Sequence, residues 1–307
     1  MRYTLPRIWT QETSREFGIY WSDALMYGTL QPVPEADELL KFYDSDRYSD
    51  YLSGVGKTKS TPRKEGLVDK IITKLAWQLD KGDPEAAEYL VQNVDISGHI
   101  CDIGCGDGQL LKTLQPHCRS ATGIDPSKVS IQALAEKELD GFLGTAEVLP
   151  VEVLERRFDV ITMQQSLEHC SDPVLAMQNI RGICATNGRL LVEVPNHECF
   201  GFAKYGPAWF HTDAGRHIHF FTARSLGELA ASTGWQALHF GYFSYTRQFS
   251  ASWISSMQEV WDRLYDTPSI PGARRAKQSD RLTDLMSTAF AQRGLQYDVV
   301  RMVCAPA

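Results

Sequence analysis

The chain has no long hydrophobic run. No uninterrupted apolar stretch approaches the ~20 residues that a membrane-spanning helix needs. The first residues include Arg2, Arg7, Glu12 and Arg15 and lack the continuous apolar core of a secretion signal. We therefore expect a protein that does not interact with a membrane.

Paired cysteine motifs are also missing. The seven cysteines are an odd number, and no two of them are spaced as C-x-x-C. This usage favours reduced thiols in an intracellular protein over a disulfide framework. The cytoplasm is the expected location.

Positive charge is scarce relative to negative charge. The 31 lysines and arginines are outnumbered by 38 aspartates and glutamates, which gives a formal net charge of -7. This balance argues against a broad nucleic-acid-binding face, because such a face is basic. We expect a small molecule, and no nucleic acid, as the partner.

The chain does contain a glycine-rich turn after an apolar run. Residues 100–108 read Ile-Cys-Asp-Ile-Gly-Cys-Gly-Asp-Gly and lead into the helical pattern Gln-Leu-Leu-Lys-Thr-Leu. Glycines let the backbone take positive φ angles and let a ligand lie against the main chain. Free N–H groups and the dipole at the start of the helix favour a negatively charged group. We therefore expect a nucleotide-like ligand.

An acidic residue ends the next predicted strand. Asp125 closes the run Ala-Thr-Gly-Ile-Asp, 21 residues after Gly104. A carboxylate at this place can accept hydrogen bonds from ribose hydroxyls. The glycine spacing is G-x-G-x-G, whereas the dinucleotide fingerprint is G-x-G-x-x-G. An NAD-dependent oxidoreductase is therefore an alternative that would need the third glycine one residue later.

From residue 99 onward, short β-like runs alternate with helical ones. This alternation is typical of a parallel sheet with helices on both faces. Such a sheet gathers the loops after its strands in one crevice. The predicted strands are 99–103, 120–125, 141–145, 158–164, 188–194, 235–245 and 296–304. The predicted helices lie near 108–115, 127–138, 173–185 and 223–233.

With these motifs the chain resembles the class I S-adenosylmethionine-dependent methyltransferases. Their first motif reads acidic-x-G-x-G-x-G, as residues 102–108 do, and their second ends in an acidic residue, as at Asp125. The resemblance implies a Rossmann-like α/β fold with a seven-stranded, mostly parallel sheet. Around it we expect an N-terminal arm or cap and a helical insertion before the last strand. The expected division is 1–62 for the arm, 63–245 and 295–307 for the core, and 246–294 for the insertion.

The resemblance also implies where S-adenosylmethionine binds. Its methionine end would follow the glycine loop, its ribose would contact Asp125, and its adenine would lie near residues 145–147. Thr145 stands where the family usually has an acidic residue, so Glu147 or a backbone carbonyl would contact the adenine amino group. The alternative at 145–147 is a simple turn. The predicted cofactor-binding residues are Asp102, Gly104, Cys105, Gly106, Gly108, Asp125, Pro126, Ala146, Glu147 and Gln164.

The catalytic candidates are one glutamate and three histidines. Glu168 and His169 follow the fourth predicted strand, where an imidazole near its ordinary pKa of about 6.5 could take a proton from a hydroxyl. His169 could instead be a core residue or a helix-start contact. His217 and His219 belong to Arg-His-Ile-His-Phe-Phe-Thr (216–222), which resembles a bacterial subgroup with an R-H-x-x-H/F-F-T segment. That subgroup acts on sugars or secondary metabolites. Glu168 would orient an imidazole or hold the substrate.

A divalent metal is an alternative role for the same residues. Some ubiquinone-pathway and small-RNA 2′-O-methyltransferases carry E-x-x-E-H and a later His, which bind a divalent ion. Here Gln165 replaces the first carboxylate, and a hard cation loses one charged ligand. We therefore predict no metal, with Glu168, His169 and His217 as the ligands in the alternative.

Together these residues predict a methyltransferase that methylates an oxygen of a small molecule or sugar. N- or C-methylation is an alternative within the same class. A non-catalytic S-adenosylmethionine-binding protein is an alternative from another class, although the histidines near the crevice favour an enzyme. The oligomeric state stays open, with a homodimer as one option.

Overall fold

A computed structural model describes residues 2–4, 17–35, 66–213, 216–255 and 278–307. Most of the expected N-terminal arm and the middle of the expected insertion lie outside these ranges. Within them, every helix falls short of the length and hydrophobicity that a membrane crossing requires.

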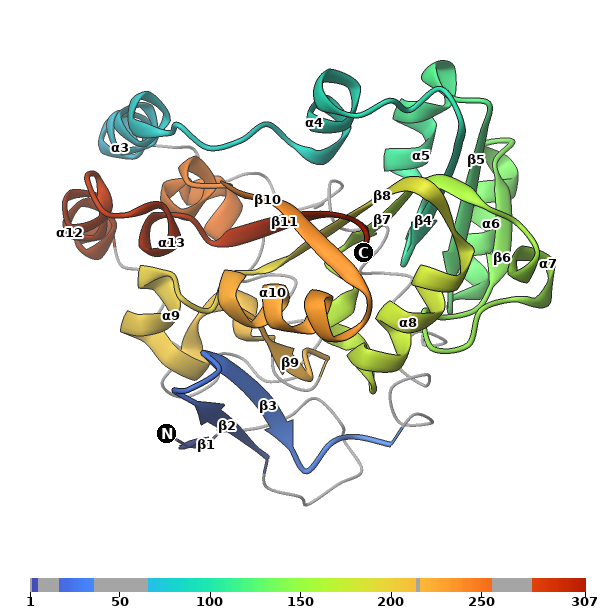
Figure 1. Cartoon of the computed structure of the whole chain (residues 1–307). Coiled ribbons are helices and arrows are strands. Elements are labelled where there is room, and N and C mark those ends of the chain that lie inside the picture. The colour runs from blue at the N-terminus through green and yellow to red at the C-terminus, as the bar shows by residue number, and fades with distance from the viewer. Residues whose placement is uncertain (1, 5–16, 36–65, 214–215, 256–277) are drawn as a thin grey trace.

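The centre of the protein is a seven-stranded sheet in the order β10-β11-β8-β7-β4-β5-β6 (Figure 1). Its last strand in sequence, β11, runs antiparallel to both neighbours, whereas the strands from β8 to β6 are mutually parallel. The predicted fold class is therefore confirmed. The strands are β4 (His99–Ile103), β5 (Ser120–Asp125), β6 (Asp140–Leu143), β7 (Phe158–Gln164), β8 (Cys184–Pro195), β10 (Trp235–Phe243) and β11 (Val299–Pro306).

Helices cover both faces of this sheet. The two faces have separate apolar cores, one against α8 and α10 and the other against α4, α5 and α6. Since both faces are buried, the central strands are apolar runs with little alternation. The helices are α3 (Leu67–Leu79), α4 (Ala86–Asn93), α5 (Gln109–Leu114), α6 (Lys128–Glu136), α7 (Val151–Leu154), α8 (Pro173–Ile183), α9 (Phe200–Tyr205), α10 (Ala223–Ser232), α12 (Gln278–Thr288) and α13 (Arg293–Gln296).

Polar side chains cap the N-termini of three of the predicted helices. Ser127 accepts a hydrogen bond from the N–H of Ser130 at the start of α6, and Asp172 caps α8. Thr222 forms a capping box with Ser225 at the start of α10. Such caps satisfy backbone donors that have no partner inside the helix, so the helix starts follow from the local sequence.

A second, four-stranded sheet was not predicted. It has the order β1-β2-β3-β9 and is built from β1 (Arg2–Thr4), β2 (Gly18–Ser22), β3 (Tyr27–Gln31) and the two-residue strand β9 (His219–Phe220) (Figure 1). Phe17, Ile19, Leu30, Ile218 and Phe220 form its small core. The N-terminal part of the chain therefore packs directly on the segment that carries His217 and His219.

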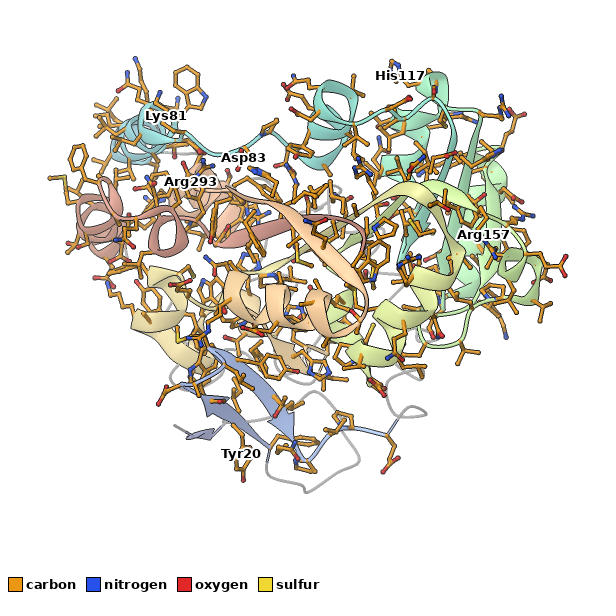
Figure 2. All side chains as sticks on the ribbon, viewed as in Figure 1. Tyr20, Lys81, Asp83, His117, Arg157 and Arg293 are labelled. Carbon is orange, nitrogen blue, oxygen red and sulfur yellow. The ribbon has the colours of Figure 1, made fainter. Side chains whose placement is uncertain are left out.

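Asp83, in the loop before α4, contacts residues of the C-terminal part of the chain. Asp83 and Arg293 lie beside each other (Figure 2), with Arg293 Nη2 2.7 Å from Asp83 Oδ2. The same carboxylate accepts a hydrogen bond from the N–H of Tyr242 in β10. These contacts hold α13 and the end of β10 together, next to the edge of the sheet where the parallel strands end.

Candidate active site

The glycine loop joins β4 to α5. Gly104, Gly106 and Gly108 have φ angles of +76°, +52° and +74°, a region that residues with a side chain rarely adopt. A Cβ atom at Gly104 would lie 2.5 Å from Cβ of Ser166. The loop therefore requires glycine at these three positions, and at Gly104 the close approach of Ser166 is a second reason.

Asp125 ends β5 beside this loop. Its Oδ2 accepts a hydrogen bond from the N–H of Gly106 at 2.9 Å, and its Oδ1 accepts one from Ser127, also at 2.9 Å. Burial raises the pKa of Asp125, and these two hydrogen bonds oppose the rise. The glycine loop follows β4, and Asp125 with its neighbour Pro126 lies at the end of the adjacent strand β5. The structure thus brings these predicted residues together.

Asp102 and Gln164 lie on neighbouring strands near the start of the loop. Asp102 pairs with Thr162 across β4 and β7, and its Oδ1 accepts a hydrogen bond from the Thr162 hydroxyl at 2.7 Å. Burial raises the pKa of Asp102 to about 7. Gln164 follows Thr162 by two residues on the same face of β7. Both predicted residues therefore face the region beside Gly104.

The Glu147 side chain accepts hydrogen bonds from the protein's own backbone. Its Oε1 accepts hydrogen bonds from the N–H groups of Ser171 at 2.6 Å and Asp172 at 3.3 Å. Asn179 Nδ2 donates to the carbonyl oxygens of Ala146 and Glu147 at 3.1 and 2.8 Å. The turn at 145–147 is thus fixed against α8, and Oε1 of Glu147 already accepts two backbone hydrogen bonds.

Three of the four catalytic candidates form one cluster. Glu168 and His169 lie in the 3-10 helix η2 (Leu167–His169), and His217 lies just before β9. The imidazole rings of His169 and His217 have centroids 4.7 Å apart. The N–H of Ile218 donates to the carbonyl of Glu168 at 2.8 Å, so the two segments are held together.

Backbone contacts fix which nitrogen of each ring is available. Nδ1 of His169 lies 2.9 Å from the carbonyl oxygen of Arg216, and Nδ1 of His217 lies 2.9 Å from that of His211. A carbonyl only accepts, so each Nδ1 carries the proton and donates. In the neutral rings the Nε2 atoms keep their lone pairs, which can accept a proton or bind a metal.

Glu168 is fully buried, and within the described ranges neither carboxylate oxygen has a hydrogen-bond partner on another residue. Its Oε1 lies 3.8 Å from Nε2 of His217. Burial raises the pKa of Glu168 to about 8. Glu168, His169 and His217 each offer a ligand atom within 4.8 Å of the others. Unpartnered carboxylate oxygens beside two oriented imidazoles fit a divalent cation.

The ordinary pKa predicted for His169 is wrong. Burial, together with the positive charge of Arg216, lowers the pKa of His169 to about 4. Burial also lowers the pKa of His217 well below its usual value and that of His219 to about 4. These imidazoles are neutral at pH 7 and are weak bases.

His219 lies apart from the cluster, on strand β9. Its Nδ1 contacts the hydroxyl of Tyr27, and the two rings stack with an interplanar angle of 8°. Tyr27 was missed by sequence reasoning, because only the pairing of β3 with β9 brings it here. The pair Asp213 and Arg216, joined through Arg216 Nε at 2.8 Å, was missed as well.

Residues 65–239 match the family described as a methyltransferase domain. The chain belongs to this methyltransferase family. The match covers the glycine loop, Asp125 and the cluster of Glu168, His169 and His217, but not the strands β1, β2 and β3.

Curated relatives of this methyltransferase include two bacterial proteins. The ubiquinone biosynthesis O-methyltransferase of Coxiella burnetii is 28% identical over 167 residues, which are 53% of this chain and 63% of that protein. The protein of the same name from Stutzerimonas stutzeri is 28% identical over 148 residues, 45% and 63% of the two chains. The methyltransferase thus spans less than two thirds of the length of either relative.

Solved structures share the fold of this methyltransferase. The [4+2]-cyclase SpnF has a TM-score of 0.56 at 20% identity, covering 90% of this chain and 97% of that one. Magnesium protoporphyrin IX methyltransferase from Synechocystis PCC 6803, with bound SAH, has a TM-score of 0.51 at 12% identity, covering 89% and 100%. At these identities the likeness concerns the fold alone.

Proposed function

We propose that this chain transfers a methyl group from S-adenosylmethionine to an oxygen of a small molecule or sugar. The observation that best supports the proposal is the hydrogen bond from the N–H of Gly106 to Asp125, which links the carboxylate proposed to bind ribose to the glycine loop. The names of the O-methyltransferase relatives support oxygen as the acceptor atom.

The chain's own groups account for binding of the donor. The loop at 104–108 receives the methionine end, Asp125 the ribose, and the turn around Ala146 the adenine. Asp102 and Gln164 face the ammonium group. The bound donor supplies a methyl group on a sulfonium, which is already a good leaving group. The protein has mainly to orient the acceptor, and orientation can contribute about 7–11 kcal/mol.

Among the four catalytic candidates, Glu168 is the one we assign as proton acceptor. Its raised pKa of about 8 makes its ionised form a stronger base than an ordinary carboxylate. His169 and His217 are too weakly basic to hold the proton, and we assign them the role of positioning the acceptor beside Glu168. We assign His219, which lies on β9 two residues after His217, a supporting role beside the cluster.

A divalent metal held by Glu168, His169 and His217 is a second candidate feature. The unpartnered carboxylate oxygens of Glu168 favour it, since a cation would satisfy them. A bound metal would lower the pKa of the acceptor hydroxyl. The chain's contribution is to hold both imidazoles through their Nδ1 contacts to backbone carbonyls.

The alternative from another class is a protein that binds S-adenosylmethionine without transferring its methyl group. A fold by itself does not determine the reaction, and the structurally similar SpnF is named a cyclase. NAD binding is disfavoured by the early third glycine. N- or C-methylation differs from the proposal only in the acceptor atom.

We also propose the division of the chain and its setting in the cell. The core is formed by 63–245 and 295–307, the arm by 1–62 and the insertion by 246–294. All seven cysteines are free thiols, which supports the cytoplasm. The net charge of -7 supports a small-molecule partner over a nucleic acid. A homodimer stays an option.

Transfer of a labelled methyl group tests this function. The protein is incubated with methyl-labelled S-adenosylmethionine and a metabolite extract, and with RNA or total protein in parallel. We expect label in the metabolite fraction, reduced to background in Glu168→Gln. Label in RNA or protein would contradict the acceptor class. Binding of the donor without any transfer would favour the non-catalytic alternative.

A further inference from the structure

Three polar side chains form a row across the middle of the main sheet. Gln164, Glu193 and Arg301 are register neighbours on β7, β8 and β11. Gln164 Nε2 donates to Glu193 Oε2 at 2.7 Å, and Arg301 Nε donates to Glu193 Oε1 at 2.6 Å. Each carboxylate oxygen therefore has its own donor.

The ion pair between Glu193 and Arg301 is buried, and its guanidinium group packs against two aromatic rings. Glu193 is 3% exposed and Arg301 is fully buried. The Arg301 guanidinium carbon lies 4.6 Å from the ring centre of Tyr89 and 4.7 Å from that of Phe243. A buried ion pair is weak support for stability, because desolvation offsets its attraction. Its position beside the candidate site suggests another role.

The carboxylate determines the orientation of the Gln164 amide. An ionised carboxylate can only accept, so the NH2 group of Gln164 faces Glu193 and its carbonyl oxygen faces away. That oxygen makes no hydrogen bond to any residue in the described ranges, and Gln164 is only half-buried. Because Asp102 pairs with Thr162, the alternation along β7 places Gln164 beside Gly104 at the glycine loop.

We propose that Glu193 and Arg301 are positioning residues, which hold the Gln164 amide so that its carbonyl oxygen accepts a hydrogen bond from the ammonium group of the bound donor. The inference rests on the proposed function, because it needs a donor with an amino-acid end at this loop. It adds two residues that lie on β8 and β11, away from the glycine and acidic motifs.

The substitution Glu193→Gln tests the orientation. Arg301 would take the carbonyl oxygen of the new amide, which leaves an NH2 group facing Gln164. Gln164 would then rotate its own carbonyl toward that NH2 group and present a donor to the ammonium. The amino-acid end of the ligand should lose affinity, whereas its adenosine end should be unaffected.

Calorimetry with two ligands separates these ends. S-adenosylhomocysteine has the amino-acid end, and 5′-methylthioadenosine lacks it. We expect Glu193→Gln to weaken S-adenosylhomocysteine binding by about tenfold or more, the size of one hydrogen bond to a charged group. Binding of 5′-methylthioadenosine should change less than about twofold, which also shows that the variant is folded.

A double-mutant cycle distinguishes positioning from a general structural effect. In a Gln164→Met background, Glu193→Gln should have no further effect on S-adenosylhomocysteine affinity. Glu152→Gln, at an exposed position on α7, is the matched control and should bind both ligands like the wild type. Loss of both ligands in Glu193→Gln, loss of neither, or an undiminished effect in the Gln164→Met background would overturn the inference. Failure of the wild type to bind S-adenosylhomocysteine would instead contradict the proposed function.

Discussion

The carboxylate of Glu168 lies 3.8 Å from Nε2 of His217, and no other residue that the structure describes forms a hydrogen bond with either of its oxygens. Glu168 follows β7 in the main sheet, whereas His217 precedes β9 of the smaller one. The two sheets thus meet at this buried acid. An acid in this state should respond strongly to pH and to cations.

Glu168 should make the stability of the protein depend on pH. Its folded-state pKa of about 8 lies above the ordinary 4.5, so the folded protein holds a proton that the unfolded chain releases. This contribution is complete below about pH 4.5 and is lost as the pH rises toward 8. Between pH 5.5 and 8.5 in chelator, wild type should lose on the order of 1–3 kcal/mol more unfolding free energy than Glu168→Gln. Equal pH dependence of the two proteins in urea denaturation would show that Glu168 titrates normally.

Divalent cations should stabilise the same cluster. A cation bound to Glu168, His169 and His217 would stabilise only the folded state, and the gain grows with its concentration. Thermal denaturation with millimolar Mg²⁺ or Mn²⁺ should raise the midpoint of the wild type but not of His217→Ala. If both proteins respond alike, the cation binds elsewhere. If neither responds, Glu168 acts without a metal.

Substitution of Gly104 should damage the cofactor loop. Its φ of +76° and the 2.5 Å contact that a Cβ atom would make with Ser166 both oppose a side chain. Gly104→Ala should cost about 1–3 kcal/mol of stability and remove most S-adenosylhomocysteine binding. Gly182, near the end of α8, has nothing within 4 Å of its added Cβ. Gly182→Ala should therefore be neutral or stabilising by up to about 1 kcal/mol, with binding unchanged. Comparable losses in both variants would argue against a special role of the loop.

Asp125 should contribute to affinity through the ribose. Asp125→Ala removes the acceptor for the ribose hydroxyls and the anchor of the Gly106 N–H. We expect affinity for both S-adenosylhomocysteine and 5′-methylthioadenosine to fall by about tenfold to a hundredfold, because both ligands contain the ribose. Glu152→Ala, which removes an exposed acid on α7 outside the proposed site, is the control. Unchanged binding in Asp125→Ala would remove the ribose contact from the account.

The elements that the sequence predicted correctly are those marked by a pattern of neighbouring residues. The bounds of β4, β5 and β7 agree with the predicted strands, because each is an apolar run that ends at a turn. The glycine loop and Asp125 were identified for the same reason, since their spacing is local. Helices α6, α8 and α10 also begin within one residue of their predicted starts, each at a side chain that caps the helix.

The parts that sequence did not predict depend on contacts between distant segments. Strand β9 has two residues, and its partner β3 lies far earlier in the chain. The low pKa of His169 follows from burial and from Arg216, which no local pattern places beside it. Likewise, Glu193 and Arg301 fell within predicted strands, but only the sheet order makes them neighbours.

Binding of the methyl donor is the central claim, and calorimetry tests it most directly. The protein is titrated with S-adenosylhomocysteine and, in a matched experiment, with NAD⁺. We predict saturable binding of S-adenosylhomocysteine to one site per chain and no binding of NAD⁺. Binding of NAD⁺, or of neither ligand, would contradict the account.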